Sequence, residues 1–112
     1  MSKYYSRKVI IDGIKFDSKK EGNRYLELKL LLKAGKIRDL ELQKKFTLQE
    51  KYKINGKTIR AISYIADFTY WDNEKNEMIV EDVKGGKATQ TQIYKLKKKI
   101  FMYRYGIEIK EV

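Results

Sequence analysis

The sequence predicts an α/β fold in which a central mixed β-sheet is flanked by helices. Two dipeptides typical of tight hairpin turns, Asp12-Gly13 and Asn55-Gly56, each stand between short β-prone runs. Two longer segments have the apolar spacing of helices, and strands are expected before and after each of them. This order predicts a mixed sheet with helices packed against it. The 112 residues are the length of one domain, so we expect a single domain over residues 1–112.

The N-terminal third is expected to form a hairpin followed by a helix. Val9-Ile10-Ile11 and Ile14-Lys15-Phe16 flank the first turn. Ser18 and Glu21 have the S-x-x-E spacing of a capping box, and Gly35 supplies a C-terminal stop, so the helix should run from about Lys19 to Ala34. The predicted buried stripe of this helix consists of Tyr25, Leu28, Leu31 and Leu32.

The centre of the chain is expected to supply most of the sheet. Residues 37–42 and 46–48 are either short strands or extended connections. The second turn joins residues 51–54 to a long β-prone segment, residues 58–71. The remaining expected elements here are a polar turn over 72–76 and a strand over 78–84.

The C-terminal part is expected to contain a second helix and a closing strand. Gly85-Gly86 ends the preceding strand, Thr89 can cap, and the helix should run from about Gln90 to Tyr105. Its predicted inward residues are Ile93, Leu96, Ile100 and Tyr103. Residues 107–112 are expected to add the last strand.

The composition excludes several kinds of chemistry. The chain has no Cys and no His, which excludes disulfides, Cys/His zinc sites, Cys nucleophiles and imidazole catalysis. With 26 Lys and Arg against 15 Asp and Glu, the formal net charge is +11. Nucleic acid is therefore the expected partner, ahead of an anionic membrane surface. Because neither a signal peptide nor a transmembrane run is visible, we expect a cytoplasmic protein.

Two acids on either side of the polar turn over residues 72–76 predict a metal site. A hairpin centred between Glu74 and Lys75 puts Asp67 directly opposite Asp82. Two like charges that face each other are destabilising unless a cation lies between them, and Mg²⁺ is commonly held by two carboxylates with water and phosphate. Lys84 shares this face, where its ammonium can hold a phosphate or polarise the attacking water. The alternative is that both acids are solvent-side residues neutralised by nearby Lys, but their apolar neighbours favour a strand covered on both faces.

These residues resemble the signature of the PD-(D/E)XK nuclease superfamily. Ala66-Asp67, a turn and then Val80-Glu81-Asp82-Val83-Lys84-Gly85 have its order of an Asp, an Asp or Glu, and a Lys two residues later, although the usual Pro is absent. Phe16-Asp17-Ser18-Lys19-Lys20-Glu21-Gly22 and the last helix resemble small phage-encoded endonucleases of that superfamily.

The resemblance implies a restriction-endonuclease-like core and a DNA nuclease that uses Mg²⁺ or Mn²⁺. It implies that Asp67, Asp82 and the backbone carbonyl of Val83 hold the metal, that Lys84 is the catalytic lysine, and that Glu21 is the additional acid of many members. It also implies a phage or prophage setting in a bacterial cell, with DNA recombination or replication as the process and branched DNA as one candidate substrate.

Glu21 and Glu81 need separate interpretation. As the last residue of the capping box, Glu21 is explained by helix initiation alone. It also continues the stripe of Tyr25, Leu28 and Leu32, which directs it toward the sheet and the predicted site. The sequence leaves both interpretations open. Glu81, by strand parity, faces away from Asp82 and is expected to be structural.

Polar and basic residues around the second helix form the expected DNA-binding surface. These residues are Lys87, Gln90, Gln92, Tyr94, Lys95 and Lys98. Phosphate neutralisation by Lys supplies most sequence-independent affinity for nucleic acid. Gln90 to Tyr94 also fits the Q-x-x-x-Y pattern that follows the lysine in exonuclease-like members of the superfamily. The alternative is that this is only the solvated face of an amphipathic helix.

Together these features predict a metal-dependent DNA nuclease, with endonuclease as the expected type. The alternative is a non-catalytic basic DNA-binding module on the same fold, which the retention of Asp67, Asp82 and Lys84 argues against. A basic RNA-associated protein would explain the charge but not the paired acids. Substrate structure and oligomeric state stay open, a homodimer being one alternative.

Overall fold

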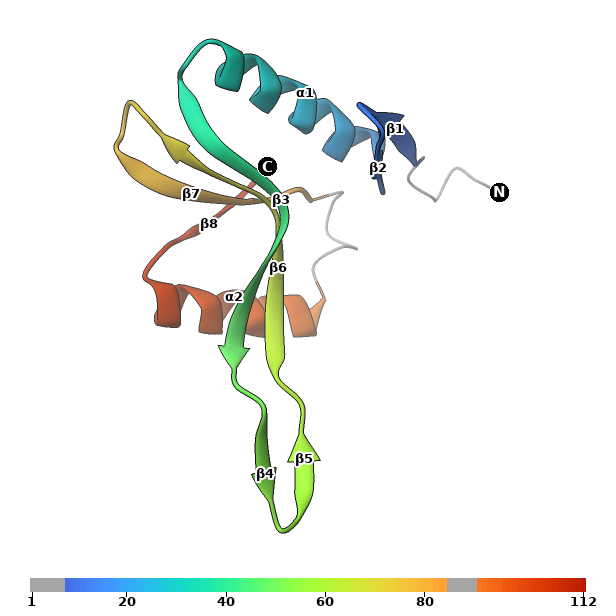
Figure 1. Cartoon of the computed structure of the whole chain (residues 1–112), viewed down its shortest axis with the longest axis vertical. Helices are drawn as coiled ribbons and strands as arrows, with labels where there is room; N and C mark the ends of the chain where they lie inside the picture. Colours follow the sequence, from blue (N-terminus) through green and yellow to red (C-terminus); the bar gives the residue numbers. More distant parts are fainter. Residues whose placement is uncertain (1–7, 85–90) are drawn as a thin grey trace.

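A computed structural model describes residues 8–84 and 91–112 of the chain, shown in Figure 1. Its strands are β1 (Val9–Ile11), β2 (Ile14–Phe16), β3 (Ile37–Gln49), β4 (Tyr52–Ile54), β5 (Lys57–Ile59), β6 (Ile62–Asp72), β7 (Glu77–Asp82) and β8 (Ile109–Glu111). Its helices are α1 (Lys19–Lys33) and α2 (Gln92–Tyr105). Within the described ranges, neither helix is long and apolar enough to cross a membrane.

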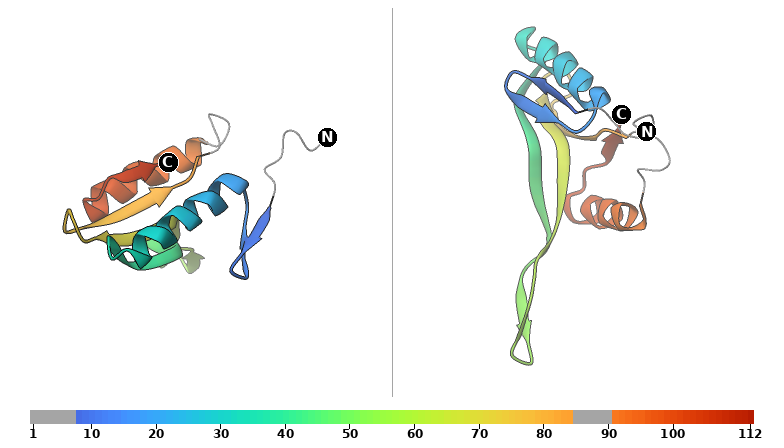
Figure 2. Two further views of the ribbon diagram at one scale, coloured as in Figure 1. Left: turned by 90° about the horizontal axis from the view of Figure 1, so that it is seen from above. Right: turned by 90° about the vertical axis from the view of Figure 1, so that its right-hand side faces the viewer.

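The central sheet has four strands in the order β3-β6-β7-β8. The first two pairs are antiparallel, and β7 and β8 are parallel. The sheet lies between α1 and α2 (Figures 1 and 2). The predicted α/β class, a mixed sheet flanked by helices, is therefore confirmed.

Two hydrophobic clusters hold the helices to the sheet. On the α2 side, the ring of Phe101 packs with its centroid 4.9 Å from that of Phe46 and 5.3 Å from that of Tyr64. On the α1 side, the buried side chains of Leu28 and Phe68 lie in one cluster. Apolar contact therefore holds α1 on one side of the sheet and α2 on the other. The polar residues at the end of β7 lie between these two packed layers.

The sequence predicted most of the elements but not their continuity. The first hairpin and α1 are confirmed, and residues 37–49 form one long strand. Asp39 and Gln43 within this strand have left-handed backbones, with φ of 55° and 53°. Such a conformation is uncommon outside glycine, and Asp39 lies at a shift of the β3–β6 register between Arg38 and Glu41.

The β-prone segment predicted over residues 58–71 is divided between two strands, β5 and β6. Arg60 and Ala61 interrupt it, so that β4 and β5 pair only with each other as a two-stranded sheet. Asn55 and Gly56 form the predicted turn, with φ of 50° and 77°, the positive values that a type I′ turn requires.

The predicted buried faces of the helices need correction. Leu31 of α1 is 36% exposed, and the predicted inward residues Ile93, Leu96 and Tyr103 of α2 are all exposed. In α2 the aromatic ring of Phe101 enters the core instead, and packing of this ring against Phe46 and Tyr64 fixes the rotation of the helix.

The start of α2 also differs from the prediction. Thr89, the predicted cap, lies outside the described residues. Thr91 caps the helix, because its Oγ1 accepts a hydrogen bond of 3.0 Å from the Tyr94 N–H. Gly106 ends the helix with a φ of 66°.

Candidate active site

Strands β6 and β7 bring Asp67 beside Asp82. The pairing runs from Asp72 with Glu77 to Phe68 with Glu81, the register that the sequence predicted. One step further along this register are Asp67 and Asp82. The Val83 N–H donates a hydrogen bond of 2.8 Å to Oδ2 of Asp67, which holds Asp67 against the end of β7.

Asp82 lies at the centre of the site and is buried, with 8% of its surface exposed. The Tyr64 hydroxyl donates a hydrogen bond of 2.8 Å to its Oδ2, and the Lys84 Nζ lies 3.5 Å from its Oδ1. Burial, together with the neighbouring Asp67 carboxylate, raises the pKa of Asp82 to about 6. Negative charge at this position is therefore only partly compensated by the protein.

Lys84 contacts both the sheet and α2. Its Nζ lies 3.2 Å from the centre of the Tyr94 ring, a cation–π contact that orients the ammonium. The Tyr94 hydroxyl in turn donates a hydrogen bond of 2.7 Å to Glu111 on β8. The lysine side chain is thus held between the Asp82 carboxylate and an aromatic ring that is itself anchored.

Glu21 points into the site rather than completing a capping box. Ser18 Oγ accepts a hydrogen bond of 3.1 Å from the Glu21 N–H, so Ser18 is the N-cap as predicted. The Glu21 carboxylate accepts a hydrogen bond of 3.2 Å from the Gln43 side chain, on β3. Burial first, and then the charges of Asp67, Asp17 and Asp82, raise the pKa of Glu21 to about 7.

Gln43 is a central residue that the sequence did not reveal. Its amide nitrogen donates to Glu21 and, at 3.1 Å, to Oδ1 of Asp67, so it joins the two carboxylates. Its left-handed backbone is uncommon for a residue of this kind and costs about 1–3 kcal/mol. Strain of this size is often kept at functional sites, and nothing in the sequence pattern around residue 43 predicts it.

A buried ion pair fixes α1 over β7. Glu81 is fully buried, and its carboxylate accepts hydrogen bonds from Arg24 Nε at 2.8 Å and Nη2 at 2.5 Å. The Tyr70 hydroxyl also donates to it. Because Glu21 lies one turn before Arg24 on α1, this pair places the Glu21 carboxylate above the strand that carries Asp82. The prediction that Glu81 is structural agrees with these contacts.

Two further contacts position the N-terminus of α1. The Lys20 ammonium donates to the backbone carbonyl of Lys84. Gly22 leaves room for the first hairpin, because a Cβ at this position would lie 2.7 Å from Val9 Cγ2 and 3.0 Å from Ile11 Cδ1. A larger residue at position 22 would push the hairpin and the helix apart.

The site opens to the surface through two hollows. The first is lined by Ser63, Tyr64, Ile65, Asp82, Lys84, Thr91, Ile93, Tyr94 and Lys97. The second is lined by Ile14, Lys15, Phe16, Asp17, Glu21, Leu42 and Gln43. The first hollow combines the Asp82 carboxylate with the cations and hydroxyls that are expected around a bound phosphate.

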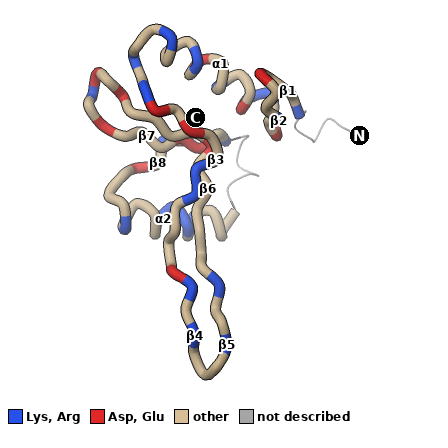
Figure 3. Tube along the Cα trace, viewed as in Figure 1, with Lys and Arg blue, Asp and Glu red and all other residues tan. Residues whose placement is uncertain are grey.

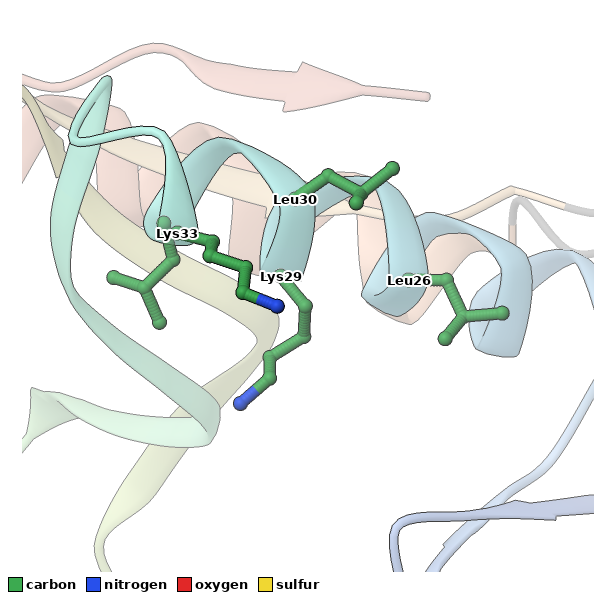
Figure 4. Close-up of a pocket in the computed structure, with 5 residues that line it drawn as sticks. Leu26, Lys29, Leu30 and Lys33 are labelled. Atoms are coloured by element: carbon green, nitrogen blue, oxygen red, sulfur yellow. The ribbon is translucent and has the colours of Figure 1, made fainter.

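A third, more apolar hollow lies on the opposite face of α1 (Figure 4). It is lined by Leu26, Lys29, Leu30, Leu32 and Lys33. It contains no carboxylate, and Leu26 and Leu30 lie on the side of the helix away from Glu21. This hollow is therefore not part of the acidic site.

The predicted DNA-binding residues are distributed unevenly around the site. Lys87 and Gln90 lie outside the described residues. Gln92 and Lys95 are exposed, whereas Lys98 forms an ion pair of 3.0 Å with Glu111. Lys97, which lines the first hollow with Lys84, is better placed to meet a phosphate than Lys98.

The donor set of the site suits a hard divalent cation, although it is not a ready-made metal centre. Carboxylate oxygens of Glu21, Asp67 and Asp82 are the ligands that Mg²⁺ and Mn²⁺ prefer. Across residues 8–84 and 91–112, however, no three acidic side chains converge closely enough to surround one ion. Gln43 lies between Glu21 and Asp67, and Val83, whose carbonyl was expected to bind the metal, contacts Asp67 through its N–H.

Comparison with known families places the chain in one of them. Residues 1–111 match DUF1064, whose description is "protein of unknown function", and the chain belongs to this family. No curated protein and no solved structure shows significant similarity to it. The functional argument therefore depends on the site itself.

Proposed function

We propose that this chain is a divalent-metal-dependent deoxyribonuclease that hydrolyses phosphodiester bonds. The observation that carries the proposal is the position of the Lys84 ammonium, 3.5 Å from the carboxylate of Asp82, which in turn neighbours the carboxylate of Asp67. Two acids on adjacent strands and a lysine two residues after the second acid form a constellation suited to phosphoryl transfer. A purely structural ion pair does not require the second acid.

Each residue of the site has a role in this proposal. Asp67 and Asp82 would hold the cation, with Glu21 as a further ligand. A bound Mg²⁺ or Mn²⁺ would neutralise these acids, polarise the scissile phosphate and lower the pKa of the attacking water. Lys84 would hold a non-bridging oxygen of the phosphate, and Tyr64 would fix the orientation of the Asp82 carboxylate through its hydrogen bond.

The charge of the molecule supports a nucleic acid as the substrate. The net charge is +11, and Lys and Arg residues occur along β3, in both strands of the β4–β5 hairpin and along α2 (Figure 3). The acids of the site are therefore surrounded by a surface that attracts a polyanion. The choice of DNA, the phage setting and a role in recombination come from the PD-(D/E)XK resemblance and are part of the proposal.

The proposal is tested by incubating the purified protein with linear, single-stranded, flap and four-way-junction DNA in Mg²⁺, Mn²⁺ or EDTA. We expect cleavage of at least one substrate with metal and none with EDTA. Isothermal calorimetry of Mg²⁺ or Mn²⁺ binding, with and without DNA, provides a second readout. If the protein neither binds Mg²⁺ or Mn²⁺ nor cleaves any of these DNAs, the proposal is refuted.

One observation favours a second function, a non-catalytic DNA-binding module. Gln43 lies between Glu21 and Asp67 and satisfies both carboxylates without a cation. If that arrangement persists with DNA bound, the acids are structural. Tight DNA binding without metal binding or cleavage would establish this alternative.

A further inference from the structure

Gln49 of β3 pairs with Ile62 of β6. The residues between them, 50–61, form a hairpin that we call the arm. The arm extends away from the helices and the sheet at one end of the longest dimension of the molecule, 52 Å (Figures 1 and 2). We propose that this arm binds the major groove of duplex DNA beside the candidate active site. The inference depends on the proposed function for the choice of DNA as the polyanion.

The arm has no core of its own. Ile59 is half-buried and every other residue of the arm is exposed. Its two strands, β4 and β5, pair only with each other, and an isolated two-stranded hairpin is marginally stable in water. A feature that adds little to the packing of the protein and projects beyond it is better explained by contact with a partner.

The charges of the arm identify the chemistry of that partner. Lys53 lies within β4, whereas Lys51 directly precedes β4 and Arg60 directly follows β5, so that both stand next to the Tyr52–Ile59 pair at the base of the arm. Among the residues that the structure describes, no acidic side chain pairs with these three cations. Glu50 is the single acid in the arm. Three uncompensated cations along one short ribbon match the phosphates of a nucleic acid.

The base of the arm adjoins the hollow that contains Asp82 and Lys84. Ser63 and Ile65 line that hollow, and Arg60 precedes Ser63 by three residues on the same chain segment. At about 3.3 Å per residue, the arm spans from roughly 10 Å to roughly 23 Å beyond Ser63. With about 3.4 Å per base pair, it would contact DNA roughly three to seven base pairs from the hollow.

The dimensions of the arm fit duplex DNA better than a second copy of the chain. A two-stranded ribbon enters the major groove, which is about 12 Å wide. A stable protein interface takes about 20 to 30 residues on each side, more than the whole arm supplies. Two arms that met through their basic residues would also repel each other.

The test measures DNA affinity by fluorescence anisotropy in EDTA, so that it does not depend on cleavage. The probe is a DNA duplex of about 24 base pairs, roughly two helical turns. The arm variant is Lys51→Gln with Lys53→Gln and Arg60→Gln. The control variant, Lys33→Gln with Lys36→Gln and Lys75→Gln, has the same net charge but is altered at exposed sites outside the arm.

We expect the arm variant to bind roughly tenfold or more weakly and to lose close to three units of the salt slope, since each phosphate contact contributes about 0.9. The control variant should stay near wild type. On an RNA duplex of equal length the two variants should bind alike, because the deep, narrow groove of A-form RNA does not admit the ribbon. Equal losses in the arm and control variants on DNA would overturn the inference.

A second variant keeps the test decisive if the substitutions disturb the arm. Replacing residues 50–61 by Asn-Gly closes the β3–β6 hairpin with a two-residue turn between its paired ends, Gln49 and Ile62. This variant should fold, with circular dichroism as the check, and show the same loss of affinity. Unchanged affinity, or a wild-type dimer that the deletion converts to monomer in sedimentation, would assign the arm to another role. Wild-type protein that binds no DNA would instead refute the proposed function.

Discussion

The ammonium of Lys84 and the carboxylate of Asp82 lie 3.5 Å apart at the end of β7. Both side chains have a second contact, Lys84 with the Tyr94 ring and Asp82 with the Tyr64 hydroxyl. A lysine held in this way can approach a phosphate bound beside the acids without a large rearrangement. This geometry leads to the first prediction.

Lys84→Ala should lower the rate of DNA cleavage by about 10² to 10⁴, the range typical of one catalytic group in a transition state. DNA affinity should change little, because Lys84 is one phosphate contact among many. Single-turnover cleavage and anisotropy measure the two effects separately. If Lys84→Ala cleaves at the wild-type rate, Lys84 has no part in the mechanism.

Glu21→Gln should separate the two interpretations of Glu21. The glutamine can remain beside Gln43 and leaves the Ser18 cap intact, so the protein should fold normally. It supplies no negative charge to a cation, and we expect cleavage at least about 100-fold slower, with partial recovery at raised Mn²⁺.

The matched control for Glu21 is Ser18→Ala. Loss of the N-cap should cost about 1 kcal/mol of stability while cleavage continues. The opposite pattern, normal cleavage by Glu21→Gln, would exclude the Glu21 carboxylate from the catalytic site.

The stability of the metal-free protein should fall as pH rises. Burial and neighbouring acids raise the pKa values of Glu21 to about 7 and of Asp82 to about 6, above the ordinary 4.5 and 3.8. Between the ordinary and the raised pKa of each group, the folded state therefore binds more protons than the unfolded state. The free energy of unfolding decreases as pH rises through that range. The pKa values of Asp72 and Glu111 are lowered, so these two groups change stability only at pH values below their ordinary pKa of 3.8 and 4.5.

Urea unfolding followed by Trp71 fluorescence, at about pH 5 and about pH 8, measures this change. Glu21→Gln combined with Asp82→Asn should flatten the dependence. Mg²⁺ should raise the stability of the wild type at the higher pH but not that of the double variant, because a ligand of the folded state stabilises it. A wild type that is equally stable at both pH values would contradict the assigned shifts.

Arg24→Met should destabilise the fold strongly. It leaves the fully buried Glu81 carboxylate without its ion-pair partner, which costs about 3–5 kcal/mol. Addition of Glu81→Gln should recover much of the loss, since a neutral amide needs no counter-charge. Chemical denaturation of the single and double variants checks both statements, and a single variant as stable as wild type would show that the pair does not hold α1 to β7.

The sequence was informative about the acids for a simple reason. A tight turn fixes the register of the strands on both sides of it, so parity alone placed Asp67 beside Asp82 and Glu81 away from it. The capping pattern placed Ser18 correctly as the N-cap because helix initiation is local, whereas the Glu21 side chain turns to Gln43 instead of completing the box. These relationships need no knowledge of distant parts of the chain.

The residues that the sequence missed depend on distant contacts. Gln43 reaches Glu21 and Asp67 through a left-handed backbone that local pattern does not reveal. The inward face of α2 follows from the packing of Phe101 on Phe46 and Tyr64, not from its own apolar stripe. The hairpin arm has the same alternating pattern as a strand pair in a sheet, and only the tertiary structure shows that its residues stay exposed among residues 8–84 and 91–112.

The most direct test of the account is the rate of DNA cleavage by Asp82→Asn compared with wild type in Mg²⁺, measured on the substrate that the wild type cleaves best. Asparagine keeps an acceptor for the Tyr64 hydroxyl, so the fold and DNA affinity should be retained. The account predicts metal-dependent cleavage by the wild type and a loss of at least about 100-fold in the variant. Cleavage at an unchanged rate by Asp82→Asn, or no cleavage of any DNA by wild-type protein that binds it, would contradict the account.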